Sequence, residues 1–431
     1  MDRRRLAPVL LLGSAAFFGG LAVPWHGTAS EVAGGEPAAG PAPEPAAERA
    51  AQPAAERAAE PAAEAPARTA LGDFELDEDS GRYVAPLAGG RASLTLDPGL
   101  QARLTRLLAD YRVPWGATVL LEPRTGRVLA LAEHSQKEPE ARGLSFRAMA
   151  PAASIFKIVT TAALLERGVG PDAEVCYHGG KHALSPRHLA DDPARDRRCL
   201  TLASALGHSA NAVFAKLADR GLSPELLRSE AERFLWNAPI PFAKPVEVSR
   251  ADIPDDPFSL AQTAAGFGPV RLSALHGALV AAIVANGGVF VPPEIVDSVE
   301  GAPRPGGPAA RRVVDERVAA ALGEMMRTTV TEGTARRFFR DRQARAAFGD
   351  RSIAGKTGSL AERDPYRDYS WFVGFAPADD PEVAVASVVV NERLWRVKAP
   401  YVAREALRAW FERAPGRAHA SLGPGRLPAA Q

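Results

Sequence analysis

Ser154 and Lys157 lie three positions apart in the stretch PAASIFKIVTTAALLERG, residues 151–168. Apolar residues recur there at helical spacing, so the stretch predicts a helix with one buried face. Because positions i and i+3 share a face of a helix, the amine of Lys157 can lie beside the hydroxyl of Ser154. Burial lowers the pKa of a lysine, and a neutral amine can take the proton of a serine nucleophile. We therefore expect Ser154 as nucleophile and Lys157 as general base; the alternative is a helix-capping serine beside a lysine that reaches the surface.

Ser209 and Asn211 stand between two helical stretches, LTLASALGH and AVFAKLADRG. A hydroxyl at this place can relay a proton between Lys157 and a leaving group. The amide of Asn211 offers both a donor and an acceptor to the peptide bond of a substrate. Serine and asparagine are also ordinary residues at the start of a helix, and the two roles can coexist. We predict Ser209 as a proton relay and Asn211 as a substrate contact.

The segment AGKTGSL supplies a second lysine, hydroxyl groups and a glycine on a predicted edge strand. A cation at Lys356 would lower the pKa of the first lysine further. Lys356 and Thr357 suit the carboxylate of a substrate, by charge and by hydrogen bond. Gly358 lets a substrate backbone approach closely, and the backbone N–H groups of Ser359 and Ser154 can together stabilise an oxyanion. The alternative is an exposed turn that happens to contain glycine.

These motifs need strands and helices to position them. Residues 116–134 predict a β-hairpin around a glycine turn, and a mainly helical region follows over 151–285. RSIAGKTGSL, YSWFVGFAP and EVAVASVVVNE predict further strands, and PYVAREALRAWFERA predicts a closing helix. Strands from both ends with helices between them predict an α+β fold, an antiparallel sheet flanked by helices with a mainly helical subdomain. We place this domain at 93–415 and a disordered tail at 416–431.

The N-terminal region predicts export. The residues MDRRR form a basic flank before an apolar run of ~20 residues, long enough to span a bilayer. We expect residues 1–28 to be an uncleaved signal anchor, with a cleaved signal peptide as the alternative. Residues 29–92 are rich in Pro, Ala and Glu and predict a disordered linker. The expected location is the inner (cytoplasmic) membrane, single-pass, with the folded domain in the periplasm.

Charge and cysteine content limit the partners. The chain has a formal net charge of +1, so no strong field attracts nucleic acid. It has no Gly-rich phosphate loop, and we expect no cofactor.

Cys176 and Cys199 can pair in an exported chain, so we expect a disulfide, with two unpaired cysteines as the alternative. His178, His182 and His188 are irregularly spaced, so we expect no metal site.

The three motifs, in this order, resemble those of the penicillin-binding protein transpeptidase family. The resemblance spans roughly residues 93–415 and includes VLLEPRTGRVLALA, EGTARR and YSWFVGFAP. It implies the serine β-lactamase-like fold. Ala210 departs from the pattern at the middle of the second motif, which leaves the catalytic pair intact but changes fine substrate contacts. The region before residue 93 is too short for a glycosyltransferase or the usual pedestal domain, so a monofunctional member is implied.

The resemblance also implies a reaction. The D-alanyl-D-alanine end of a peptidoglycan stem peptide would acylate Ser154, and the amine of a neighbouring stem, or water, would then take the acyl group. Transfer to an amine is D,D-transpeptidation, and transfer to water is D,D-carboxypeptidation. β-Lactams would be inhibitors, and division or elongation proteins would be partners. Two alternatives are a β-lactamase related to class D and a penicillin-sensing or non-catalytic binding domain; Asn211 and the long linker favour the transpeptidase.

Overall fold

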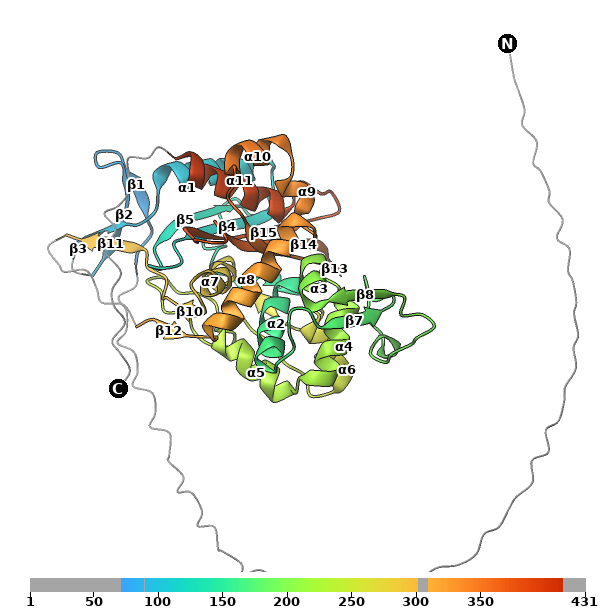
Figure 1. Cartoon of the computed structure of the whole chain (residues 1–431). Coiled ribbons are helices and arrows are strands. Elements are labelled where there is room, and N and C mark those ends of the chain that lie inside the picture. The colour runs from blue at the N-terminus through green and yellow to red at the C-terminus, as the bar shows by residue number, and fades with distance from the viewer. Residues whose placement is uncertain (1–70, 89, 301–308, 414–431) are drawn as a thin grey trace, which may run out of the picture. The chain divides into compact units, whose positions relative to one another are not determined.

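The computed structural model describes residues 71–88, 90–300 and 309–413 (Figure 1). The predicted anchor at 1–28, the predicted tail at 416–431 and the linker up to residue 70 lie outside the described residues. Within the described ranges, no helix combines the length and the apolar character that crossing a bilayer requires.

The main sheet positions the third motif. Its strands, in order across the sheet, are β13 (Ala354–Arg363), β14 (Tyr366–Ala376), β15 (Val383–Asn391), β4 (Trp115–Leu121) and β5 (Val128–His134). Every neighbouring pair is antiparallel. The predicted hairpin is therefore β4–β5, and the predicted antiparallel sheet is confirmed. β13, which carries the third motif, is the edge strand on one side.

Helices cover both faces of this sheet. Trp371 and Phe372 are neighbours on β14 but belong to different apolar clusters, because successive residues of a strand point to opposite faces. Helices α1 (Pro98–Asp110) and α11 (Ala399–Glu412) pack on the face of Phe372, and α7 (Ala274–Ala285) packs on the other. The central strand β15, VAVASVVVN, is consequently buried at every position.

The mainly helical region that the sequence predicts is present below the sheet in Figure 1. It contains α2 (Lys157–Glu166), α3 (Leu202–His208), α4 (Asn211–Gly221), α5 (Pro224–Arg233) and α6 (Pro257–Ala264). Side chains of Thr201, Ser223 and Asp256 accept backbone N–H bonds at the starts of α3, α5 and α6, which satisfies donors that a helix leaves free.

A small hairpin projects from this region (Figure 1). Its strands are β7 (Glu174–Tyr177) and β8 (Arg198–Thr201), and residues 178–197 connect them through a 3-10 turn, η2 (Pro186–His188). Cys176 and Cys199 are directly opposite each other and are joined by a disulfide.

The start of the folded part differs from the prediction. We expected the linker to continue to residue 92, whereas β1 (Glu75–Asp77), β2 (Arg82–Leu87) and β3 (Gly90–Leu94) form a small sheet with β11 (Val296–Val299). Val84 is only 4% exposed and Ala85 only 2%. The stretch is acidic and contains several glycines, and the strand that completes its sheet, β11, lies far away in the sequence. The local sequence therefore does not predict this sheet.

The remaining elements of the described residues are short, apart from the 16-residue helix α8. They are β6 (Ala150–Pro151), η1 (Ala153–Ile155), β9 (Arg271–Leu272), β10 (Val289–Phe290), β12 (Arg311–Arg312), α8 (Glu316–Thr331), α9 (Arg336–Phe339) and α10 (Arg342–Phe348). The turn η1 lies in contact with β13 and β14, which brings the first and third motifs together.

Candidate active site

Ser154 is held by a constrained turn. It lies on η1, directly before α2, and its neighbour Ala153 has a left-handed backbone with φ of 48°, a conformation that costs energy for a residue other than glycine. Gly266 packs closely against this turn, since a Cβ added there would lie 2.6 Å from the carbonyl oxygen of Ala153. From the sheet, the indole N–H of Trp371 donates to the carbonyl of Pro151 at 2.9 Å. The backbone that carries the hydroxyl is therefore fixed from two sides.

Lys157, the first residue of α2, is fully buried and reaches three oxygen atoms. Its Nζ lies 3.0 Å from Ser154 Oγ, 2.8 Å from Asn211 Oδ1 and 2.5 Å from the carbonyl oxygen of Ala265. The last two oxygens can only accept hydrogen bonds, whereas the hydroxyl can also donate. A neutral amine has two N–H donors and one lone pair, so it can satisfy both acceptors and still accept the proton of Ser154. The predicted nucleophile and base are thus in contact.

The second and third motifs meet at Ser209. This residue ends α3 in a left-handed conformation, with φ of 56°. Its Oγ accepts a hydrogen bond from Lys356 Nζ at 3.0 Å, and the same amine donates to the carbonyl of Thr357 at 2.9 Å. The described residues contain no direct hydrogen bond between Ser209 and Lys157, so the predicted relay would begin from Lys356 or through the substrate.

Asn211 has both ends of its amide occupied. Oδ1 accepts from Lys157, as given above, while Nδ2 donates to the carbonyl oxygens of Gly180 at 3.3 Å and Lys181 at 2.9 Å. We predicted a substrate contact from this side chain. In the structure it first orients the amine of the predicted base, and a further lone pair of Oδ1 remains for a ligand.

The remaining residues of the third motif line the edge of β13 beside η1. Thr357 is partly exposed, and Ser359 is exposed. Gly358 is close to the turn that carries the nucleophile, since a Cβ added there would lie 3.2 Å from the carbonyl oxygen of Ala152 and 3.2 Å from Ile155 Cγ1. The lack of a side chain at this position therefore allows the strand to approach the turn. The predicted roles of these residues toward a substrate stay predictions.

Two buried amines dominate the electrostatics. Burial, and secondly the neighbouring charge of Lys356, hold the pKa of Lys157 well below its usual value. Burial lowers the pKa of Lys356 to about 7. Within the described part of the chain, no carboxylate lies within ion-pair distance of either amine. Both effects favour the neutral form of Lys157, which is the form that a general base requires.

Comparison with known proteins identifies the family. Residues 116–409, more than half of the chain, match the family model described as the penicillin binding protein transpeptidase domain. The chain belongs to the penicillin-binding protein transpeptidase family. The resemblance that the three motifs carry is therefore confirmed.

Named relatives and solved structures agree with this assignment. The peptidoglycan D,D-transpeptidase PbpA of Mycobacterium tuberculosis (strain H37Rv) is 30% identical over 354 residues, covering 70% of this chain and 68% of the relative. The D,D-transpeptidase domain of a peptidoglycan glycosyltransferase from Eggerthella lenta matches with a TM-score of 0.61 and 25% identity, over 80% of this chain and 99% of that one. Penicillin-binding protein A of M. tuberculosis, solved as an imipenem acyl-enzyme complex, matches with a TM-score of 0.59 and 27% identity, over 75% and 80%.

Two residues of this transpeptidase domain were not singled out as site residues from the sequence. Thr334 follows α8, and its Oγ1 lies 2.5 Å from Thr357 Oγ1. Gly266 supports the serine turn, as described above. Both lie in segments that resemble the family, EGTARR and AAGFGPV. Each acts by contact with a residue distant in sequence, so spacing alone does not reveal its role. A glycine between apolar residues was the available signal for Gly266.

Proposed function

We propose that the chain is a peptidoglycan D,D-transpeptidase that works through an acyl-enzyme on Ser154. The observation that carries the proposal is the 3.0 Å contact between Ser154 Oγ and the buried Nζ of Lys157. The support from relatives is that the M. tuberculosis proteins named above are a peptidoglycan D,D-transpeptidase and a protein acylated by imipenem. No relative reported above is a β-lactamase, so we do not favour that alternative.

In this mechanism Lys157 takes the proton of Ser154 as Oγ attacks the carbonyl carbon between the two D-alanines. The negative charge that develops on the carbonyl oxygen is stabilised by the backbone N–H groups of Ser154 and Ser359. Ser209 relays a proton to the leaving amine of the terminal D-alanine. This proton is the one that Lys157 took from Ser154, passed on through Lys356 or the substrate, so that Lys157 becomes neutral again. Lys157 then takes a proton from the acceptor amine as that amine attacks the ester, and returns it to Ser154 Oγ as the ester bond breaks.

Lys356, Thr357 and Asn211 hold the substrate in this scheme. The charge of Lys356 favours the terminal carboxylate of the stem peptide, and the hydroxyl of Thr357 donates to it. The amide of Asn211 contacts the peptide bond before the scissile one. Gly358 allows the extended substrate to lie beside β13. β-Lactams inhibit by acylating the same serine.

We further propose that residues 1–28 anchor the chain in the inner membrane with the transpeptidase domain exported. The basic flank and the apolar run of the sequence support this location. A disulfide between Cys176 and Cys199 fits an oxidising compartment. Division or elongation proteins stay predicted partners.

A labelled penicillin tests the proposal. The purified chain should gain one penicilloyl mass that maps to Ser154, and Ser154→Ala should gain none. An adduct that turns over rapidly would point to the β-lactamase, and the absence of any adduct would exclude both enzymes. Two synthetic stem peptides, one with a free acceptor amine, then separate transpeptidation from carboxypeptidation by the mass of the product.

A further inference from the structure

Helix α4 is attached to the β7–β8 connection at two points. Asn211, its first residue, donates through Nδ2 to the carbonyls of Gly180 and Lys181, as described above. Lys216, farther along the same helix, donates through Nζ to the carbonyl of Cys176 at 3.0 Å and to Asp196 Oδ2 at 2.5 Å. Both attachments reach the segment that the hairpin encloses, so this segment and the start of α4 are fixed relative to each other.

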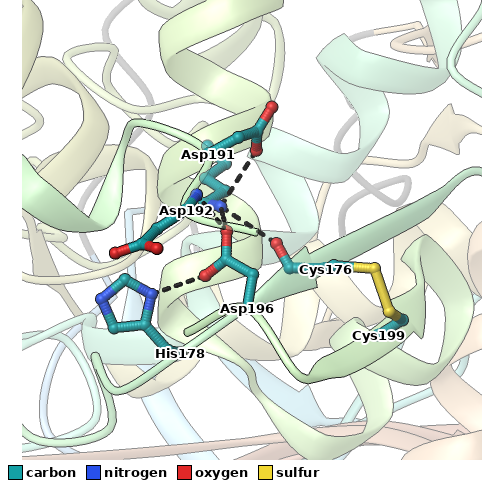
Figure 2. Close-up of a disulfide and its surroundings, with 7 residues drawn as sticks. Cys176, His178, Asp191, Asp192, Asp196 and Cys199 are labelled. Carbon is teal, nitrogen blue, oxygen red and sulfur yellow. Dashed lines mark hydrogen bonds and ion pairs between the residues drawn. A yellow bond between two sulfur atoms is a disulfide. The ribbon is translucent and has the colours of Figure 1, made fainter. Parts of the chain in front are cut away.

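The second attachment is an ion pair between two buried side chains, and the exposed carboxylate of Asp191 also lies 3.1 Å from the same amine. The side chain of Lys216 is fully buried and that of Asp196 is only 5% exposed. The carboxylate also accepts the backbone N–H of Asp192 at 3.0 Å and contacts His178 Nδ1 at 2.5 Å, as Figure 2 shows. Removing two charges from water is costly, and an apolar pair of similar size would often be as stable. What the ion pair adds is a defined position for the segment.

The disulfide closes the same segment at its base. Cys176 and Cys199 are 23 residues apart in sequence, and Gly180, Lys181 and Asp196 all lie between them. The carbonyl of Cys176 is itself an acceptor for Lys216. A cross-link at this place restricts the conformations of the segment that presents carbonyls to Asn211.

We propose that the disulfide and the Lys216–Asp196 pair are a positioning device that acts on Lys157 through Asn211. The two backbone carbonyls hold the Nδ2 end of the amide, so its Oδ1 end faces the amine at 2.8 Å. If the segment moves, the amide can rotate and present N–H groups to the lone pair of Lys157, which is then unavailable to the proton of Ser154. The proposal rests on the proposed function, since it concerns the efficiency of Lys157 as a base.

Acylation kinetics with a labelled penicillin test this device, because they separate the saturation constant from the limiting rate of acylation. The chain has two cysteines, so a phosphine reductant has a single disulfide to act on. We expect the limiting rate of acylation to fall about ten-fold in three proteins: the reduced protein, the double variant Cys176→Ser/Cys199→Ser, and Asp196→Asn. The saturation constant of each should stay within about two-fold of the wild-type value. Asp255→Asn, which breaks an exposed ion pair with Arg228, is the control and should keep the wild-type rate.

A second readout distinguishes positioning from general destabilisation. In Asn211→Ala, which has no amide to orient, reduction should leave the residual acylation rate unchanged. Circular dichroism at the assay temperature verifies that each protein is folded. If the cysteine variant does not fold, Asp196→Asn still tests the device, because it retains the disulfide. Wild-type rates in the reduced protein and in Asp196→Asn would overturn the positioning device, as would an equal effect of reduction with and without Asn211. Failure of the oxidised wild type to form any adduct would instead overturn the proposed function.

Discussion

Lys356 donates a hydrogen bond to Ser209 at 3.0 Å, although the two residues are 147 positions apart in the sequence. The contact holds the second buried amine at the centre of the site, where its charge helps to lower the pKa of Lys157. The position of this second amine, in addition to burial, therefore favours the neutral form of Lys157.

The first prediction concerns that charge. Lys356→Met removes a cation that lowers the pKa of Lys157, so the pKa of Lys157 should rise. The rate of acylation by penicillin should fall at neutral pH, and its increase with pH should begin at higher pH than in the wild type. Measurement of acylation between pH 5 and 10 gives both curves. Lys137→Met, which removes an exposed lysine paired with Glu392, is the control; an unshifted curve for Lys356→Met would contradict the prediction.

The second prediction concerns Thr334, whose hydroxyl lies 2.5 Å from that of Thr357. Thr334→Val keeps the shape of the side chain but removes this hydrogen bond, so Thr357 loses its orientation toward a ligand carboxylate. The loss of one hydrogen bond corresponds to about 1 kcal/mol, and the saturation constant for penicillin should rise about five-fold. Thr334→Ser keeps the hydroxyl and should bind as the wild type does. Equal constants for the valine and serine variants would show that the contact has no such role.

The third prediction tests the support of the serine turn. Gly266 has φ of 88°, and an added Cβ would lie 2.6 Å from the carbonyl oxygen of Ala153. Gly266→Ala should therefore displace Ser154 and lower the rate of acylation by about 100-fold. Gly168 offers a matched control, because it has φ of 83° and no atom within 4 Å of an added Cβ. Gly168→Ala should cost about 1 kcal/mol of stability and leave acylation unchanged; similar acylation rates for both variants would refute the prediction.

The fourth prediction concerns stability away from the site. Burial raises the pKa of Glu230 to about 7, against a partial opposing effect of Arg233. The folded-state pKa of Glu230 lies above its unfolded-state pKa. The contribution of the protonated carboxyl to the free energy of unfolding is therefore fully present below about pH 4.5 and is lost as pH rises through 7. Glu230→Gln removes this dependence. The stability advantage of the variant over the wild type should therefore be about 3 kcal/mol larger at pH 8.5 than at pH 4.5.

Urea denaturation at the two pH values measures this difference. Glu232→Gln, which replaces an exposed carboxylate in the same helix, is the control. A Glu230→Gln variant whose advantage is the same at both pH values would mean that the buried carboxyl does not titrate in this range. Acylation by penicillin should be unaffected in either variant.

Sequence reasoning found the parts of the site whose spacing is short. Ser154 and Lys157 lie one turn apart, so a local pattern was enough to predict their contact. The sheet was equally accessible, because long apolar runs such as that of β15 are typical of strands buried on both faces.

Relationships between distant segments were not accessible in this way. The partners of Asn211 come from a connection about thirty residues earlier, and Thr334 meets Thr357 of β13 across a segment that contains α9 and α10. The strands β1 and β2 were not predicted because β11, the strand that completes their sheet, lies far along the chain. Such contacts depend on packing, which spacing in one chain does not encode.

Within the described residues, β13 stands at the rim of the main sheet and faces the serine turn. An extended ligand on that side extends the sheet through its own main chain, independently of side-chain identity. A single side-chain replacement cannot remove contacts of this kind. A displacement of β13 would therefore weaken these main-chain contacts for a β-lactam and for the natural peptide alike.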